Sequence, residues 1–127
     1  MEPGPKAGIT TVVGPADTAA ALGSGDVPVL GTPRLLALAE AATVQAVATA
    51  LAPGQTSVGT SVRLEHTAPS PVGMRVTVTA ELTAVDGRRL TFRVEAVDAS
   101  GTVAGLGTVE RVVVDRDTFL AGLPETR

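Results

Sequence analysis

The feature that most constrains the fold is one long segment, Pro33 to Leu51, which contains no glycine and no second proline. Alanine and leucine dominate it, Thr32 suits the N-cap of a helix with Pro33 at its first position, and Pro53-Gly54 suits its end. Such a helix spans roughly 28 Å, about the length of a strand of eight or nine residues. The sequence therefore predicts one helix long enough to lie along a whole sheet.

The remainder of the chain is typical of strands, because polar and apolar residues alternate with period two. One short strand is expected before the helix, at Ile9–Val13, and residues 14–28 read as a loop with a helical turn around Ala19 to Leu22. Four strands are expected after the helix, over Thr56–Thr67, Met74–Val85, Arg88–Ala99 and Thr102–Asp115.

These four strands are expected to form a meander with hairpin turns at Asp86-Gly87 and Ser100-Gly101. The predicted inward face of the second strand comprises Met74, Val76, Val78, Ala80, Leu82 and Ala84, and that of the third comprises Leu90, Phe92, Val94 and Ala96. One helix on one face of an antiparallel sheet is an α+β fold, and a long central helix wrapped by such a sheet is the hotdog architecture.

The length of 127 residues predicts a single domain, 1–127, with loose tails at 1–6 and 116–127. A chain this small buries a limited core, and hotdog folds usually pair edge to edge, so a homodimer is expected. The apolar run in the predicted helix is too short to span a membrane, and the N-terminus lacks the features of a signal peptide. We therefore expect a cytoplasmic protein with no membrane association.

Composition excludes several classes of function. Ten Lys and Arg stand against 13 Asp and Glu without a basic cluster, and Trp and Tyr are absent, which argues against nucleic-acid binding. The absence of cysteine excludes disulfides and a thiolate nucleophile, and a single histidine excludes a zinc site built from several histidines of one chain. No nucleotide-binding loop is present, so no metal or cofactor is expected.

Glu40 is the only charged residue between Leu35 and Val62. Helical spacing places it on an apolar face, with Leu36, Thr43, Val44 and Val47. A lone carboxylate there is costly unless it is paired, so Glu40 is expected to point into the protein or a pocket. The alternative interpretation is a half-exposed residue on the rim of an alanine-rich helix.

Two further candidates lie at the ends of predicted elements. His66 is the only imidazole, has the inward parity of Val62 and Leu64, and ends a strand, where sites are often built. A strand-end histidine with a satisfied hydrogen bond is the alternative. The Thr32 hydroxyl lies where a helix begins, so it either caps the helix or meets a carbonyl oxygen.

Gly59 and Arg111 interrupt predicted strands. Gly59 permits a close approach of the backbone or marks a bulge. Arg111 is either an ordinary exposed strand residue or the partner of a carboxylate or phosphate.

The spacing of Thr32, Glu40 and His66, with the strand Gly59-Thr60 through His66-Thr67-Ala68, resembles the fluoroacetyl-CoA thioesterase family of hotdog enzymes. The similarity extends from about Val29 to Val114, and its other specific stretches are Val76-Thr77-Val78-Thr79-Ala80-Glu81-Leu82, Val85-Asp86-Gly87-Arg88-Arg89-Leu90 and Gly107-Thr108-Val109-Glu110-Arg111.

The resemblance implies that Thr32, Glu40 and His66 form the catalytic set, with Gly59 near the thioester carbonyl or a water and Arg111 as a supporting charge. Glu40 would attack the thioester or position water, and His66 would move the proton. Hotdog dimers commonly combine residues of two subunits in one site, and the sequence leaves open whether Thr32 and Glu40 of one subunit meet His66 of the other here. The fluoroacetate-specific member has aromatic residues just before its catalytic threonine, whereas Gly23 to Gly31 contains none. The resemblance thus implies thioester hydrolysis more firmly than it implies that acyl group.

Four functions follow from these observations. The first is hydrolysis of a small acyl-CoA, and the second is hydrolysis of an acyl group on an acidic carrier protein, which Arg34, Arg63 and Arg75 would meet. The third is a non-catalytic hotdog dimer that binds an acyl ligand, although a binder has no need of a lone carboxylate in an apolar helix. The fourth is a hotdog dehydratase, whose motifs do not match these stretches.

Overall fold

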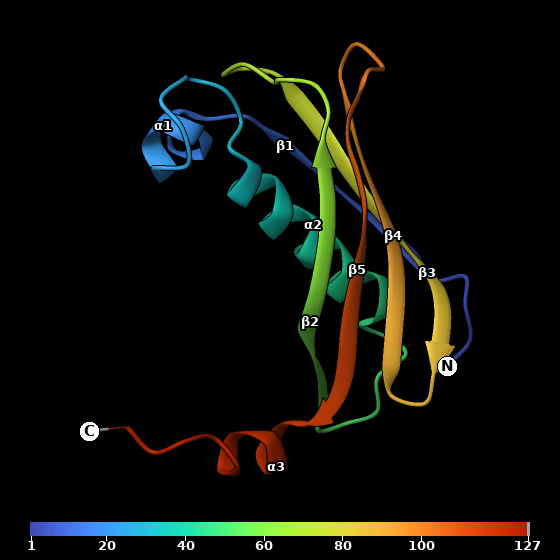
Figure 1. Ribbon diagram of the computed structural model, residues 1–127. Helices are drawn as coiled ribbons and strands as arrows, with labels where there is room; N and C mark the ends of the chain where they lie inside the picture. Colours follow the sequence, from blue (N-terminus) through green and yellow to red (C-terminus); the bar gives the residue numbers. More distant parts are fainter. Residues whose placement is uncertain (127) are drawn as a thin grey trace.

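The computed structural model describes residues 1–126 and has the α+β hotdog architecture that the sequence predicts (Figure 1). A long helix lies across one face of a five-stranded antiparallel sheet. In chain order the elements are β1 (Lys6–Val12), the 3₁₀ turn η1 (Pro15–Asp17), α1 (Ala19–Leu22), α2 (Thr32–Val47), β2 (Gln55–His66), β3 (Arg75–Asp86), β4 (Arg89–Asp98), β5 (Val103–Asp115) and α3 (Arg116–Ala121). No helix in this part of the chain is long and apolar enough to cross a membrane.

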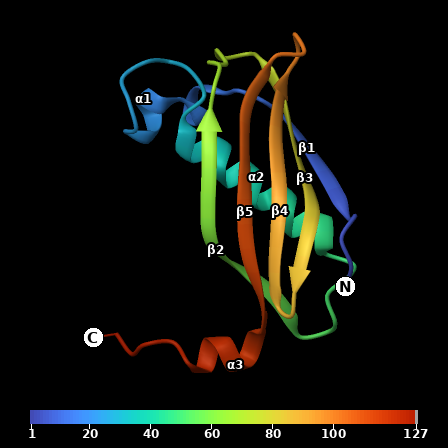
Figure 2. The ribbon, with the colours of Figure 1, turned by 45° about the vertical axis from the view of Figure 1, so that its right-hand side comes forward.

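The strand order is β1-β3-β4-β5-β2, which corrects the expected four-strand meander. Only β3, β4 and β5 follow one another as neighbours. The chain crosses from β2 to β3 through a connection that contains Pro69 and Pro71, and β2 pairs with β5 at the other side of the sheet. A tight hairpin cannot form there, because proline lacks the N–H that a ladder needs. In the observed order β2 is an edge strand with one unpaired side among the described residues (Figure 2).

Helix α2 differs from its prediction at both ends. Gly31 occupies the N-cap position, Thr32 is the first helical residue, and no side chain caps the helix start. The N-cap interpretation of Thr32 is therefore wrong, and its hydroxyl is free for another partner. The helix ends at Val47 rather than Leu51, because the chain tightens into turns in which the Ala48 and Ala50 N–H groups donate to carbonyls three residues back.

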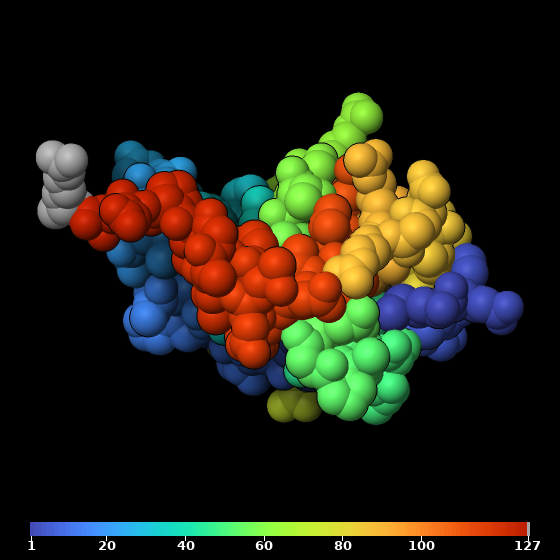
Figure 3. Space-filling view, turned by 90° about the horizontal axis from the view of Figure 1, so that it is seen from below, coloured from blue at the N-terminus to red at the C-terminus, as the bar shows by residue number. Residues whose placement is uncertain are grey.

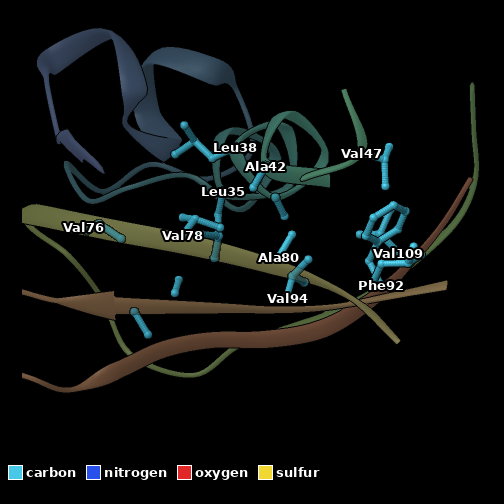
Figure 4. Packing of buried hydrophobic residues seen from close by; sticks show 14 of the residues in the cluster. Leu35, Leu38, Ala42, Val47, Val76, Val78, Ala80, Phe92, Val94 and Val109 are labelled. Atoms are coloured by element: carbon cyan, nitrogen blue, oxygen red, sulfur yellow. The ribbon is translucent and has the colours of Figure 1, made fainter. Parts of the chain in front are cut away.

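The core lies between α2 and the sheet (Figure 4), and the helix packs chiefly over β1 and β3. The fully buried large side chains include Leu35 and Val47 from the helix and Val78 and Phe92 from the sheet. The predicted inward faces of β3 and β4 are confirmed except at the end of β3. There a register shift between Leu82 and Ala84 turns Ala84 outward, because a bulge adds one residue and reverses the alternation.

The N-terminal segment is not a loose tail throughout. The Gly4 N–H donates to the Leu82 carbonyl at 2.9 Å, and the Leu82 N–H donates to the Pro5 carbonyl at 2.8 Å. These bonds extend the β1–β3 ladder, so that β1 begins at Lys6 instead of Ile9. At the other end of the chain, α3 follows β5 directly.

Candidate active site

Thr32 and His66 form a hydrogen-bonded pair at one end of the sheet. The Thr32 Oγ1 atom lies 2.8 Å from the His66 Nδ1 atom. Thr32 begins α2 and His66 ends β2, so the pair joins the start of the helix to the end of the edge strand. The inward parity predicted for His66 is confirmed, since Val62, Leu64 and His66 are all half-buried while their neighbours are exposed.

A cavity of about 300 Å³ lies beside this pair. Its walls are Thr32 and His66 together with residues of α1, the loop after it and the segment after β2: Ala19, Ser24, Val29, Leu30, Thr67, Ala68 and Pro69. The Thr32 backbone N–H has no acceptor within residues 1–126, whereas the Arg34 and Leu35 N–H groups both donate to the Gly31 carbonyl at 3.0 Å. Thr32 therefore offers a hydroxyl and a free N–H at the cavity.

The other ring nitrogen of His66, Nε2, is buried and has no hydrogen-bond partner within residues 1–126. Burial disfavours the charged imidazolium, so the pKa of His66 is lowered from its ordinary value of 6.5. The neutral ring therefore predominates at pH 7. It holds one proton and one lone pair, and Thr32 contacts only one of its two nitrogens.

A second cluster forms around Glu40 on the flank of α2 that faces β2 and β5. The Arg111 Nη1 atom donates to Glu40 Oε2 at 3.3 Å, and the Glu40 side chain remains 35% exposed. Gly59 lies directly beneath this carboxylate, because a Cβ atom at Gly59 would come within 2.5 Å of Glu40 Oε2. The absence of a side chain at Gly59 leaves the space that this position of the Glu40 carboxylate occupies, and the bulge between Gly59 and Ser61 marks the same place in β2.

Arg111 is buried, with 6% of its surface exposed, and Ser57 holds it. The Arg111 Nε atom donates to Ser57 Oγ at 2.8 Å, and Nη2 donates to the Ser57 carbonyl at 3.0 Å. These two bonds fix the plane of the guanidinium and direct Nη1 at Glu40. Burial lowers the pKa of Arg111, and the charge of Glu40 and its hydrogen bond oppose that shift. The interpretation of Arg111 as an ordinary exposed residue is wrong, and its pairing with a carboxylate is observed.

The two clusters are separate within one chain. Glu40 follows Thr32 by eight helical residues, which places their backbones about 12 Å apart. The structure thus brings together Thr32 with His66, and Glu40 with Gly59 and Arg111. Within one subunit, Thr32 and Glu40 therefore have different partners. The prediction that Glu40 shares an apolar face of the helix is confirmed only in part. Thr43 and Val47 on that face are buried, but Val44 is 45% exposed.

Ser57 was missed by the sequence reasoning. It lies two residues before Gly59, and Arg111 lies opposite Gly59 in the β2–β5 register. Residues that are two positions apart in a strand lie on the same face, so Ser57 is positioned to contact the Arg111 side chain, which emerges opposite Gly59. Only the register, which local sequence does not specify, could have identified it.

The fold, with one long helix across a five-stranded antiparallel sheet, is that of a hotdog protein. Known proteins indicate its enzymatic class. The fluoroacetyl-CoA thioesterase of Streptantibioticus cattleyicolor is 46% identical over 93 residues, which are 73% of this chain and 66% of that relative. A crystal structure of a variant of the fluoroacetyl-CoA thioesterase in complex with acetyl-CoA is 38% identical, covers 95% of both chains and has a TM-score of 0.88. A Thermus thermophilus thioesterase-superfamily protein is 32% identical, with coverage of 93% and 87% and a TM-score of 0.87.

The model of the fluoroacetyl-CoA-specific thioesterase family matches residues 13–117. The chain belongs to this family, and its enzyme class is therefore that of a thioester hydrolase.

Proposed function

We propose that the chain hydrolyses the thioester of a small acyl-CoA, with Thr32, Glu40 and His66 as the catalytic set and Gly59 and Arg111 as supporting residues. The observation that carries this proposal is the Thr32–His66 hydrogen bond of 2.8 Å beside a cavity of about 300 Å³. A cavity of that size is at the lower limit of ligand sites and favours a small acyl group. CoA is preferred over a carrier protein as the thiol because a solved relative binds acetyl-CoA.

The roles follow from hydrogen-bonding capacity. With the ring proton on Nδ1, His66 donates to Thr32 Oγ1, and the Thr32 hydroxyl proton then points to the thioester carbonyl oxygen together with the free Thr32 N–H. The Nε2 lone pair takes a proton from water as the water oxygen attacks the carbonyl carbon. When the tetrahedral intermediate collapses, the C–S bond breaks and the sulfur receives that proton from His66. The products are the carboxylic acid and the free thiol.

Glu40 completes this site only if a second subunit supplies it. The unpaired side of β2 can pair with β2 of another copy, and antiparallel pairing about a two-fold axis reverses the strand direction. We propose that this axis lies near Val62. His66 lies four residues beyond Val62 and Gly59 lies three residues before it, so the partner's Gly59, with its Glu40, would lie beside His66. The buried Nε2 atom has no hydrogen-bond partner within residues 1–126, and a water held between it and the partner's Glu40 would donate to both. We therefore propose a homodimer with two composite sites.

A mixing experiment tests the shared site. Glu40→Gln and His66→Ala variants are each expected to be folded and inactive. When they are unfolded together and refolded as a mixture, about half of the dimers contain one of each, and each such dimer has one intact composite site. Activity should therefore return to about one quarter of the wild-type value. A mixture that stays inactive, with dimers present by size-exclusion chromatography, would place all three residues of each site in one subunit.

The substrate is tested by thiol release with a disulfide reagent, since the chain has no cysteine of its own to react. The panel extends from acetyl-CoA and fluoroacetyl-CoA to branched and aryl-acetyl thioesters, with the same acyl groups on a carrier protein. Faster turnover of a short acyl-CoA supports the proposal. Turnover of carrier-bound groups alone would assign the carrier as the partner, and binding without turnover would favour the non-catalytic dimer.

A further inference from the structure

The last helix, α3, and the residues just after it carry apolar side chains that their own subunit leaves partly exposed, although Phe119 also lines a cavity with Arg88 and Val113 of that subunit. Phe119, Leu120 and Leu123 are 39%, 52% and 51% exposed. The helix is anchored at its start, where the Arg116 N–H donates to the Gly54 carbonyl at 2.9 Å, and the chain then extends away from the sheet (Figure 3). Phe119 is one of only two aromatic residues in the protein, the other being Phe92 of the core. An aromatic ring on a projecting helix is typical of a contact with another molecule.

A second exposed apolar group lies at the opposite end of β2. Leu22 of α1 and Val27 of the following loop are 44% and 51% exposed. They belong to the segment that forms one wall of the cavity through Ala19, Ser24 and Val29. Both α1 and α3 project beyond the free side of β2, one near each end of that strand (Figures 1 and 2).

We propose that α3 and the residues after it, Arg116–Leu123, form an arm that packs on the α1 segment of a second copy of this chain and forms the outer wall of that copy's cavity. The inference rests on the proposed dimer. Antiparallel pairing of two β2 strands exchanges their ends, so the α3 end of one subunit lies beside the α1 end of its partner. The arm then covers Leu22 and Val27, and Phe119 is the aromatic residue closest to the acyl site.

The arm is therefore a specificity element. It lies at the other end of β2 from Thr32 and His66 of its own subunit, and in the proposed dimer it adds a wall to the partner's cavity beside α1. The effect is expected mainly on the binding of larger acyl groups. A methyl-sized acyl group reaches the Thr32–His66 pair without touching the outer wall, whereas a longer group contacts Phe119.

The contact is tested by disulfide trapping, which is clean in a chain without cysteine. In the Leu22→Cys/Phe119→Cys variant the two thiols lie at opposite ends of one subunit, so a bond between them joins two chains. The control is Leu22→Cys/Thr79→Cys, because Thr79 is exposed on β3, away from the β2 edge. At micromolar protein under mild oxidation, we expect the first pair to give at least about tenfold more covalent dimer than the control. Equal yields from a protein that is dimeric in solution would overturn the proposal.

Enzyme kinetics provide the second part of the test. Phe119→Ala is expected to raise KM for the longest accepted acyl-CoA about tenfold while changing KM for acetyl-CoA less than twofold. An equal effect on both substrates would overturn the role in specificity. Disulfide trapping does not depend on turnover, so the two proposals are tested separately. An inactive protein that still forms the disulfide would refute the proposed hydrolysis but support the arm. An active dimer that does not form the disulfide would support the hydrolysis but refute the arm.

Discussion

The substitution Gly59→Ala would displace the Glu40 carboxylate without removing its charge, so it tests whether the position of that carboxylate matters for activity. The added Cβ atom would lie 2.5 Å from Glu40 Oε2 but 3.5 Å from Arg111 Nη1, which is ordinary contact. Only Glu40 must therefore move, and an ordinary carbon–oxygen contact requires it to retreat by about 0.8 Å. The backbone of Gly59 does not have a positive φ, so alanine adopts it without strain.

The consequences for activity and stability differ in size. A displacement of that order lengthens the Glu40–Arg111 contact of 3.3 Å toward the limit of an ion pair, and misplacing a catalytic group by about 1 Å costs on the order of 100-fold in rate. The clashing atom is the end of a side chain that is 35% exposed, so it can move into solvent. We therefore expect a loss of unfolding free energy of no more than about 1 kcal/mol, the lower end of the range for overpacking.

The assay compares kcat for acyl-CoA hydrolysis with the midpoint of thermal unfolding. The matched control is Gly8→Ala in β1, where the new Cβ atom would meet a Thr79 methyl group at 3.3 Å on an exposed face, and its kcat should stay at the wild-type value. In a Glu40→Ala background, Gly59→Ala should cost no further stability, because the clash is gone. A folded Gly59→Ala enzyme with kcat within threefold of wild type would refute this reasoning.

Three further predictions follow from the same contacts. Ser57→Ala removes the acceptor of Arg111 Nε and should lower kcat about tenfold at unchanged KM, whereas Ser57→Thr should restore kcat. A change in KM alone would instead assign Ser57 to substrate binding. Burial lowers the pKa of His66 from 6.5, and the neutral ring is the proposed base, so the acid limb of the kcat/KM profile should have its midpoint below pH 6.5; a midpoint above pH 6.5 would contradict the role of the neutral ring. Thr32→Ser should retain at least about tenfold more activity than Thr32→Ala, and equal rates would show that the hydroxyl does not assist the reaction.

Local sequence was sufficient for most of the elements. The alternation in β4 predicted the buried set from Leu90 to Ala96, because one face of a half-buried strand must be apolar at every second position. It was insufficient at the end of β3, where a bulge reverses the alternation after Leu82. It also could not place β2 at the sheet edge, because antiparallel strands pair through backbone groups that every sequence shares.

The candidate site was likewise predictable only in part. Thr32, Glu40 and His66 were each identifiable, because a hydroxyl at a helix start, a lone charge in an apolar helix and a single histidine can be recognised in the sequence. The hydrogen-bond partners of these residues could not be identified from the sequence. The Thr32–His66 bond joins residues 34 positions apart, and the Arg111–Glu40 bond joins residues 71 positions apart.

The sequence by itself determined which elements form and which chemical groups are present, because helix and strand periodicity and side-chain chemistry are local properties. Only the tertiary structure decided that Thr32 bonds to His66 instead of capping its helix, and that Arg111 is buried and held by Ser57. The physical reason is the register of β2 on β5 and the crossing of α2 over the sheet. Burial of the whole core sets both, and no single segment encodes either.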